Sequence, residues 1–287
     1  MTQTLTPIGR QWGAPGPIMQ AISAADTALW DLQGKAHGEA ISWLAGGRVR
    51  DTVPVYASSL GPTQVEEQGH FCMSEGYHAV KVKLGFGKSR DEVTLSEAQG
   101  TCGTETVLYA DANQGWTLTE ALEMAPLLHE YNIAWIEEPI RGNQLADLEE
   151  FYRKTDLPIA TGENLYSCEA FVPYINSPAI KIVQPDITKT GGLTEAFTIC
   201  KLAEAMGTEV MPHVYGGAVG FAASLQLAAC MPSVTSIEYD IRDNPLRDSL
   251  ILNGPRPTNG VISIPDKPGL GIELDSQAID LYHKEYI

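Results

Sequence analysis

Three acidic residues recur along the chain at a constant spacing, each at the end of an apolar run. Asp111 in YADANQ, Glu137 in WIEEPI and Glu163 in ATGENL are separated by 26 residues in each case. Carboxylates crowded together repel one another unless a cation lies between them. Three oxygen ligands without Cys or His suit Mg²⁺ rather than Zn²⁺. The spacing predicts a Mg²⁺ site, with Glu137 facing the metal, Glu138 turned away and Pro139 ending the strand.

Two lysines are candidates for proton transfer. Lys81 and Lys83 in AVKVKLG are two positions apart, so on a strand both side chains point to the same face. On a solvated face they would be ordinary surface charges. In the wall of a closed barrel they would be partly buried. Burial and mutual repulsion lower the pKa of an amine, which lets a lysine act as a base near neutral pH. We therefore predict a functional role for this pair.

A histidine and two further acids follow the later strands. His213 in PHV could bond through one ring nitrogen to Asp186 in QPD, which would fix its tautomer and raise its basicity. Glu238 in EYD has two interpretations. It is either a protonated hydrogen-bond donor to a substrate oxygen or a charge at the rim.

The elements that must position these residues alternate between strand and helix. Helical stretches such as 119–131 and 194–207 have apolar residues three and four positions apart. Nearly continuous apolar strands that alternate with helices indicate a parallel sheet covered by helices. Evenly spaced strands with no dinucleotide fingerprint after the first favour a closed barrel, whose catalytic groups lie at the C-terminal strand ends. Eight strands are predicted, beginning near residues 53, 78, 107, 133, 158, 179, 209 and 235.

The turn-rich segment after the eighth strand predicts a reduced or missing eighth helix, so we expect a (β/α)7β TIM-like barrel. Residues 1–50 lie outside the repeat, and we expect them to form a helical segment. Its predicted face carries Ile18, Ile22, Ala25, Leu29 and Leu32, and Gly34 or Gly38 would end the helix. The expected division is 1–50, a barrel over 51–245, and a segment 246–287 that packs beside the first.

The composition restricts the classes of partner and the cellular compartment that we expect. The 287 residues carry a net charge of −17, which argues against nucleic acid and anionic membrane surfaces as partners. Five scattered cysteines without a CxxC pair indicate reduced thiols. We expect no secretory signal, and no apolar run is long enough to span a bilayer. We expect a cytoplasmic homo-oligomer that binds a small carboxylate.

A Mg²⁺ site between lysines on one side and an Asp-His pair on the other suggests one class of reaction. A metal-polarised carboxylate loses its neighbouring α-proton to a base, and the metal stabilises the enediolate that forms. Bases on both faces allow either stereochemistry, or acid-assisted departure of a hydroxyl group. The residues leave open dehydration of a sugar acid, racemisation or epimerisation of a 2-hydroxy acid, and cycloisomerisation of a sugar lactone.

The ordered motifs KVK, DAN, EEP, GEN, QPD, PHV and EYD, from about 50 to 245, resemble those of the enolase superfamily and its mandelate racemase/muconate lactonizing enzyme subgroup. Segments 27–35, 243–247 and 268–273 are more similar to sugar-acid dehydratases and galactarolactone cycloisomerases than to mandelate racemase. Superfamily sites use a Lys or His base with Mg²⁺. The resemblance implies that Lys83 and His213 are opposed acid/base groups. It also implies that Lys81 and Glu238 contact substrate oxygens and that Asn113 lies near the metal.

The resemblance has one departure. Members of the family carry an N-terminal capping domain with an antiparallel sheet and a mobile loop over the barrel mouth, whereas residues 1–50 match only its helical part. We expect a truncated capping segment, which would lack the element that selects substrate and excludes water. This leaves a further alternative of another class, a non-catalytic metal-binding barrel.

Overall fold

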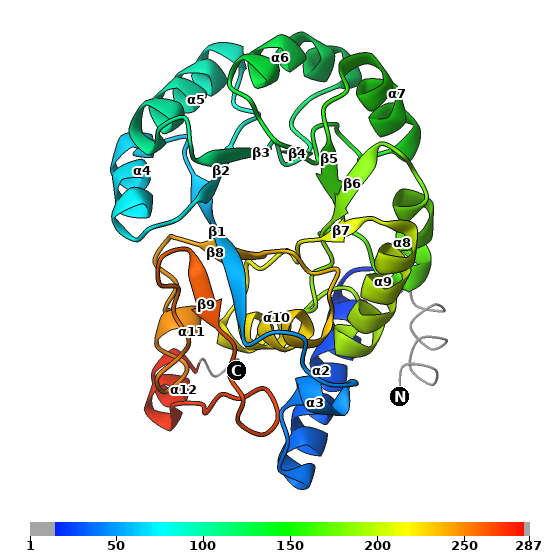
Figure 1. Ribbon diagram of the computed structural model, residues 1–287, viewed down its shortest axis with the longest axis vertical. Coiled ribbons are helices and arrows are strands. Elements are labelled where there is room, and N and C mark those ends of the chain that lie inside the picture. Colours follow the sequence, from blue (N-terminus) through cyan, green and yellow to red (C-terminus); the bar gives the residue numbers. More distant parts are fainter. Residues whose placement is uncertain (1–14, 284–287) are drawn as a thin grey trace.

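Short apolar segments form parallel strands at all of the predicted positions. The computed structural model describes residues 15–283, and its strands curl into a ring with helices outside (Figure 1). Several strands are shorter than their apolar runs, because only two residues of β4 and of β7 make ladder hydrogen bonds. The strands of the ring are β1 (Thr52–Leu60), β2 (Ala79–Lys83), β3 (Val107–Asp111), β4 (Ile136–Glu137), β5 (Ile159–Thr161), β6 (Ile180–Val183), β7 (Glu209–Val210) and β8 (Ile237–Asp240).

A helix follows each of the first seven strands, as the sequence predicted. Directly after β8 a helix of just four residues, α11 (Pro245–Asp248), forms in a turn-rich segment that contains three prolines between 245 and 257. This confirms the predicted (β/α)7β architecture. The seven outer helices are α4 (Val65–Ser74), α5 (Lys88–Cys102), α6 (Leu118–Glu130), α7 (Leu145–Thr155), α8 (Ser167–Ile175), α9 (Gly192–Met206) and α10 (Ala218–Cys230).

The ring of strands closes on itself. Hydrogen-bonded neighbours run in the order β7-β6-β5-β4-β3-β2-β1-β8. A parallel bridge between Val210 on β7 and Val234, just before β8, completes the ring. A further strand, β9 (Val261–Ser263), pairs antiparallel with the start of β1. Closure brings the C-terminal ends of all eight parallel strands to one mouth.

Side chains inside the barrel lie at two levels. Tyr56 on β1 contacts Trp135 beside β4 with ring centroids 6.0 Å apart, a contact that is possible only across the interior. The lower level is this apolar cluster: Tyr56, Ala79, Tyr109, Trp135, Ala160, Ile182 and Met211. Because strand side chains alternate, the positions two residues further along the same chain segments also face inward. These positions form a polar level above the apolar one: Ser58, Lys81, Asp111, Glu137, Gly162, Gln184 and His213.

The helix before the barrel forms, but its buried face differs from the predicted one. Helix α2 (Pro17–His37) ends at Gly38, which has a left-handed φ of 73°. Ile22 is buried as expected, yet Leu29 is 39% exposed and Leu32 is 61% exposed. The face against the barrel is instead largely polar, with Asp26 accepting hydrogen bonds from the backbone N–H and hydroxyl of Thr194 at 3.0 and 2.7 Å. Partners on α9 override the apolar pattern that the sequence analysis relied on.

The C-terminal segment packs against the helices α2 and α3 (Ile41–Leu44) that precede the barrel. The carboxylate of Asp31 accepts a hydrogen bond from Leu270 N–H at 2.8 Å, and Trp43 Nε1 donates to Asp266 at 2.9 Å. Gly34 allows this approach, since a Cβ there would lie 2.5 Å from Gly269 Cα. The segment also contains α12 (Ser276–Tyr282). The division into three units stays a prediction, and residues 1–14 and 284–287 lie outside the described part.

Two further expectations concern membranes and thiols. Within residues 15–283, no helix combines the length and the apolar character needed to cross a membrane. All five cysteines are free thiols, and four of them are buried. The second finding agrees with the reduced state that their spacing predicted.

The buried carboxylate of Asp26 provides a test of how α2 is held. We expect Asp26→Ala to lower the free energy of unfolding by about 1–3 kcal/mol, because it removes a buried carboxylate and leaves two part-buried donors on Thr194 without their acceptor. Urea denaturation measures the change. Glu123→Ala, at an exposed position of α6, is the matched acidic control and should lie within about 0.5 kcal/mol of the unaltered protein. An equal stability loss in both variants would contradict this assignment.

Candidate active site

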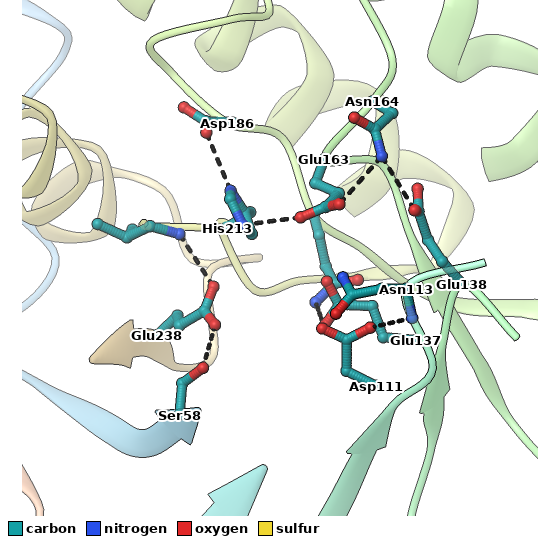
Figure 2. A network of polar contacts seen from close by, with 12 residues as sticks. Ser58, Asp111, Asn113, Glu137, Glu138, Glu163, Asn164, Asp186, His213 and Glu238 are labelled. Carbon is teal, nitrogen blue, oxygen red and sulfur yellow. Dashed lines mark hydrogen bonds and ion pairs between the residues drawn. The ribbon is translucent and has the colours of Figure 1, made fainter. Parts of the chain in front are cut away.

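The predicted site residues all lie within three residues of the C-terminal ends of the barrel strands. Figure 2 shows the acidic side chains and His213 turned towards one another across the barrel mouth. Lys83, Asp111 and Glu137 are the last residues of β2, β3 and β4. Glu163, Asp186 and His213 follow β5, β6 and β7 by two or three residues, while Lys81 and Glu238 lie within β2 and β8.

Lys81 links three carboxylates. Its fully buried Nζ lies 2.5 Å from Glu137 Oε2, 2.8 Å from Glu238 Oε1 and 3.9 Å from Asp111 Oδ2. Burial would lower the pKa of Lys81, but the charges of Glu137 and Glu238 outweigh it and raise this pKa well above its usual value. The lowered pKa predicted for the lysine pair is therefore wrong for Lys81. Glu137 on β4 and Glu238 on β8, each one strand beyond the neighbours of β2, keep it charged.

Lys83 occupies the more open end of the same strand. Its Nζ lies 2.5 Å from Asp111 Oδ2 and donates to Asn113 Oδ1 at 3.0 Å. Asn113 N–H in turn donates to Asp111 Oδ1 at 2.8 Å. The Lys83 side chain is 21% exposed, whereas that of Lys81 is fully buried. Of the two lysines, Lys83 is therefore the more accessible from the barrel mouth.

His213 bridges two acids. Its Nδ1 lies 2.9 Å from Asp186 Oδ2 and its Nε2 lies 2.7 Å from Glu163 Oε2. Burial would lower the pKa of His213, but the charge of Glu238 and the bonds to Asp186 and Glu163 raise it well above its usual value. Burial likewise would raise the pKa of Glu163, yet the hydrogen bond and charge of His213 lower it to about 2. The contact with Asp186 is the one predicted from the sequence.

Glu238 is a buried, ionised acceptor. It accepts hydrogen bonds from the Ser58 hydroxyl and from Val214 N–H, the latter at 3.0 Å, and it pairs with Lys81. Burial would raise the pKa of Glu238, but the charges of Lys81 and His213 hold it well below its usual range. Neither predicted interpretation, a protonated donor or a rim charge, describes this geometry.

The three predicted metal ligands lie on adjacent strands but do not converge on one point. No group of three or more His, Cys, Asp or Glu side chains in the range 15–283 has the geometry to hold a metal ion. The reason is that each carboxylate contacts a basic side chain. Lys83 contacts Asp111, Lys81 contacts Glu137 and His213 contacts Glu163.

The chemistry of these three carboxylates nevertheless fits a hard divalent cation. Glu137 Oε1 is buried and has no hydrogen-bond partner within the described residues. Burial and the charge of Asp111 raise the pKa of Glu137 to about 8, even though Lys81 opposes this shift. An unsatisfied carboxylate oxygen among repelling acids is the environment that an oxygen-binding cation stabilises.

Glu138 stays beside the site, contrary to the expected alternation. Strand β4 ends at Glu137, and Glu138 has a left-handed φ of 37°, so the period of two does not continue. Asn164 Nδ2 donates to Glu138 at 2.9 Å and to Glu163 at 3.0 Å (Figure 2). Burial and the charge of Glu163 raise the pKa of Glu138 to about 7. Glu138 therefore supports Glu163 through Asn164.

Three polar contacts at this mouth involve residues that the sequence analysis did not select. Ser58 donates to Glu238, Asn164 bridges two acids, and Gln184 Nε2 donates to Glu137 Oε2 at 2.9 Å. Ser58 and Gln184 could have been found by counting two positions beyond the apolar residues Tyr56 and Ile182. Asn164 follows the end of β5, where no periodicity applies.

A pocket of about 590 Å³ lies beside the barrel mouth, between α2, the start of α10 and the C-terminal segment. Its walls are mainly apolar, and Thr188 and Lys189 lie at one side of it. Thr188 contacts Asp186, so the pocket adjoins the site through that residue. None of the predicted acid/base or metal-ligating residues lines it. These candidate residues lie at the barrel mouth and not in this pocket.

Comparison with known proteins identifies relatives over most of the chain. A family model described as enolase C-terminal domain-like matches residues 64–278. D-galactarolactone cycloisomerase of Agrobacterium fabrum is 34% identical over 94% of this chain and 75% of its own length. Arabinonate dehydratase of Saccharolobus solfataricus is 30% identical over 95% of this chain and 74% of its own length.

A solved structure agrees with these relatives. The 3,6-anhydro-D-galactonate cycloisomerase from Zobellia galactanivorans superposes with a TM-score of 0.93 and 29% identity. The match covers 99% of this chain and 81% of that one. The similarity therefore extends over the barrel and over the segments on either side of it.

Gly162 holds Glu163 in place and can be tested directly. It has a φ of 139°, and a Cβ there would lie 2.8 Å from Phe171 Cε1 and 2.9 Å from Gln184 N. We expect Gly162→Ala to lower the free energy of unfolding by about 1–3 kcal/mol, measured by urea denaturation. Gly100→Ala is the control, because its Cβ would meet nothing within 4 Å in α5. The control should be neutral or stabilising by up to about 1 kcal/mol, and a cost-free Gly162→Ala would refute the assigned crowding.

Proposed function

The chain belongs to the enolase C-terminal domain-like family, and from that premise we propose that it removes the proton next to the carboxylate of a sugar acid and then eliminates water. Two contacts carry the proposal, one between Lys83 and Asp111 and one between His213 and Glu163. These pairs place two groups able to carry a proton at opposite ends of one row of carboxylates. Similarity to arabinonate dehydratase supports the substrate class.

Each proton would move at a defined atom. Lys83 Nζ, in its unprotonated form, takes the α-proton. His213 Nε2 gives a proton to the departing hydroxyl group, which leaves as water, and the resulting enol becomes a 2-keto acid. Asp186 bonds Nδ1 of His213 and so leaves Nε2 as the nitrogen that exchanges its proton. Asp186 is itself held by the N–H and hydroxyl of Thr188 at 2.8 and 2.6 Å.

Mg²⁺ is the proposed cofactor, since enolase superfamily sites work with this ion. Asp111, Glu137 and Glu163 would hold it, with Asn113 nearby. When bound, the ion supplies Lewis-acid stabilisation of the negative charge that develops on the substrate carboxylate. Lys81 and Glu238 would orient substrate oxygens from the inner side, where Lys81 is held in the charged form.

Cycloisomerisation of a sugar lactone is the second candidate, favoured by 34% identity to a galactarolactone cycloisomerase. Racemisation or epimerisation of a 2-hydroxy acid shares the first proton transfer and differs in returning the proton. Their products separate the three reactions. Dehydration gives a keto acid, cycloisomerisation gives an isomer, and epimerisation changes only configuration. A metal-binding barrel without catalysis would give none of these.

The proposed cellular location and binding partner rest on the free thiols and the net charge. The free thiols support a cytoplasmic protein, and the net charge of −17 supports a small-molecule partner rather than nucleic acid. The homo-oligomer stays a prediction.

Removal of the α-proton tests the proposal. We expect incubation with aldonic and aldaric acids and sugar lactones in D₂O with Mg²⁺ to give a 2-keto acid that carries deuterium at C3, where the enol takes up a proton from solvent, and NMR detects both. Lys83→Ala and His213→Asn should reduce turnover by at least about 10²-fold, because each removes a proton carrier, and far-UV circular dichroism should stay unchanged.

The controls for these variants lie on the same fold. Lys181→Ala, on the exposed side of β6, and His129→Asn, at the exposed end of α6, should turn over at the unaltered rate. Isomer without keto acid would favour the cycloisomerase. Full activity in both Lys83→Ala and His213→Asn, or neither product nor α-proton exchange with any acid or lactone, would refute the proposed catalysis.

Removal of the cation gives an independent test. We expect EDTA treatment to abolish α-proton exchange and added Mg²⁺ to restore it, since crowded carboxylates need a counter-ion to bind an anionic substrate. A Mg²⁺ concentration of 100 times Kd should also stabilise the fold by about 2.7 kcal/mol, measured as a rise in Tm. Activity that persists in EDTA and an unchanged Tm would contradict the cation's role.

A further inference from the structure

Gln184 is a fully buried polar residue at the barrel mouth to which the proposed reaction gives no role. It directly follows β6, and its N–H donates to Thr161 O on β5 at 2.9 Å, so the backbone is still held by the neighbouring strand. Its side chain has no exposed surface. Because Ile182, two residues earlier, belongs to the interior cluster, Gln184 points into the barrel as well.

The side chain of Gln184 reaches across one strand to a proposed metal ligand. Nε2 donates to Glu137 Oε2 at 2.9 Å, which joins the end of β6 to the end of β4. Ala160 on the intervening strand is the register partner of Glu137. Its methyl side chain is small enough for the Gln184 side chain to pass over it. Gly162, two residues later, has no side chain and packs against the Gln184 backbone. Two small residues therefore keep the path open.

Because of this contact, the two oxygens of Glu137 have different numbers of hydrogen-bonding partners. Oε2 accepts from Gln184 Nε2 and pairs with Lys81 Nζ, whereas the buried Oε1 has no partner within the described residues. Two donors on one oxygen fix the rotation of the carboxylate about its last bond. The other oxygen is left free to bind a cation.

The choice of glutamine has a cost that packing does not explain. Gln184 Oε1 is buried and lacks a hydrogen-bond partner among residues 15–283, and an unsatisfied buried acceptor costs about 1–3 kcal/mol. An apolar side chain of similar size would avoid that cost. A basic side chain at position 184, added to Lys81, would compete with a metal ion for Glu137. A neutral donor orients the carboxylate and leaves its charge for the ion.

We propose that Gln184 is a positioning residue that presents Glu137 Oε1 to the divalent cation. The inference rests on the proposed function, because it requires the Mg²⁺ site. Donors that orient a metal ligand are typically worth 10- to 100-fold in metal affinity. Gln184 touches neither substrate nor metal in this assignment and acts only through Glu137.

Isothermal titration with Mg²⁺ alone, without substrate, tests the assignment on the full chain. We expect Gln184→Met, which keeps the volume but removes the donor, to bind Mg²⁺ about 10- to 100-fold more weakly. Gln184→Asn retains an amide but shortens the side chain by one methylene, so its donor no longer reaches Glu137. We expect the same loss, and this variant decides the question if Gln184→Met does not fold.

The matched control is Gln226→Met. Gln226 is also fully buried and hydrogen-bonded, accepting from Ser42 N–H at 3.1 Å and donating to Pro265 O at 2.8 Å, but it lies on α10 outside the barrel. The Gln226→Met variant should be less stable than the unaltered protein and should bind Mg²⁺ with the same affinity. Unaltered affinity in the Gln184 variants would overturn this assignment and leave the metal site standing. No Mg²⁺ binding by the unaltered protein would overturn both.

Discussion

The balance of charge in a closed space is the constraint on which this structure depends. A closed parallel barrel directs the C-terminal ends of its strands to one mouth, and this chain places acids at most of them. Lys81, Lys83 and His213 neutralise these acids at contacts between 2.5 and 2.9 Å. Without such partners, burial of so many carboxylates would oppose folding. With them, each basic group is fixed beside at least one acid.

The apolar level below the site keeps this arrangement rigid. Tyr109 and Trp135 stack with ring centroids 4.2 Å apart, and Tyr56 packs edge-on to both. These rings fill the barrel interior two residues before the polar level, so the strands set the inward direction of Lys81, Asp111 and Glu137. Chains of hydrogen bonds then set the finer orientation, from Thr188 through Asp186 to His213 and from Gln184 to Glu137.

The relatives show how one mouth can serve several outcomes. A cycloisomerase and a dehydratase each match more than nine-tenths of this chain at 30% identity or above. A shared first proton transfer explains this, because the residues that hold the acid and the base can be the same. The product then depends on which substrate bond lies opposite the acid.

The sequence by itself determined the strand and helix order, the reduced eighth helix and the strand ends that carry the acids, because period and spacing are local properties. The pairing of His213 with Asp186 followed from the same order. Only the tertiary structure decided the polar face of α2, the charged state of Lys81 and the bonds of Glu138 and Gln184. The physical reason is that these depend on partners far apart along the chain, such as Asp26 with Thr194 and Gln184 with Glu137. No local pattern encodes which donor will face a given carboxylate once the barrel closes.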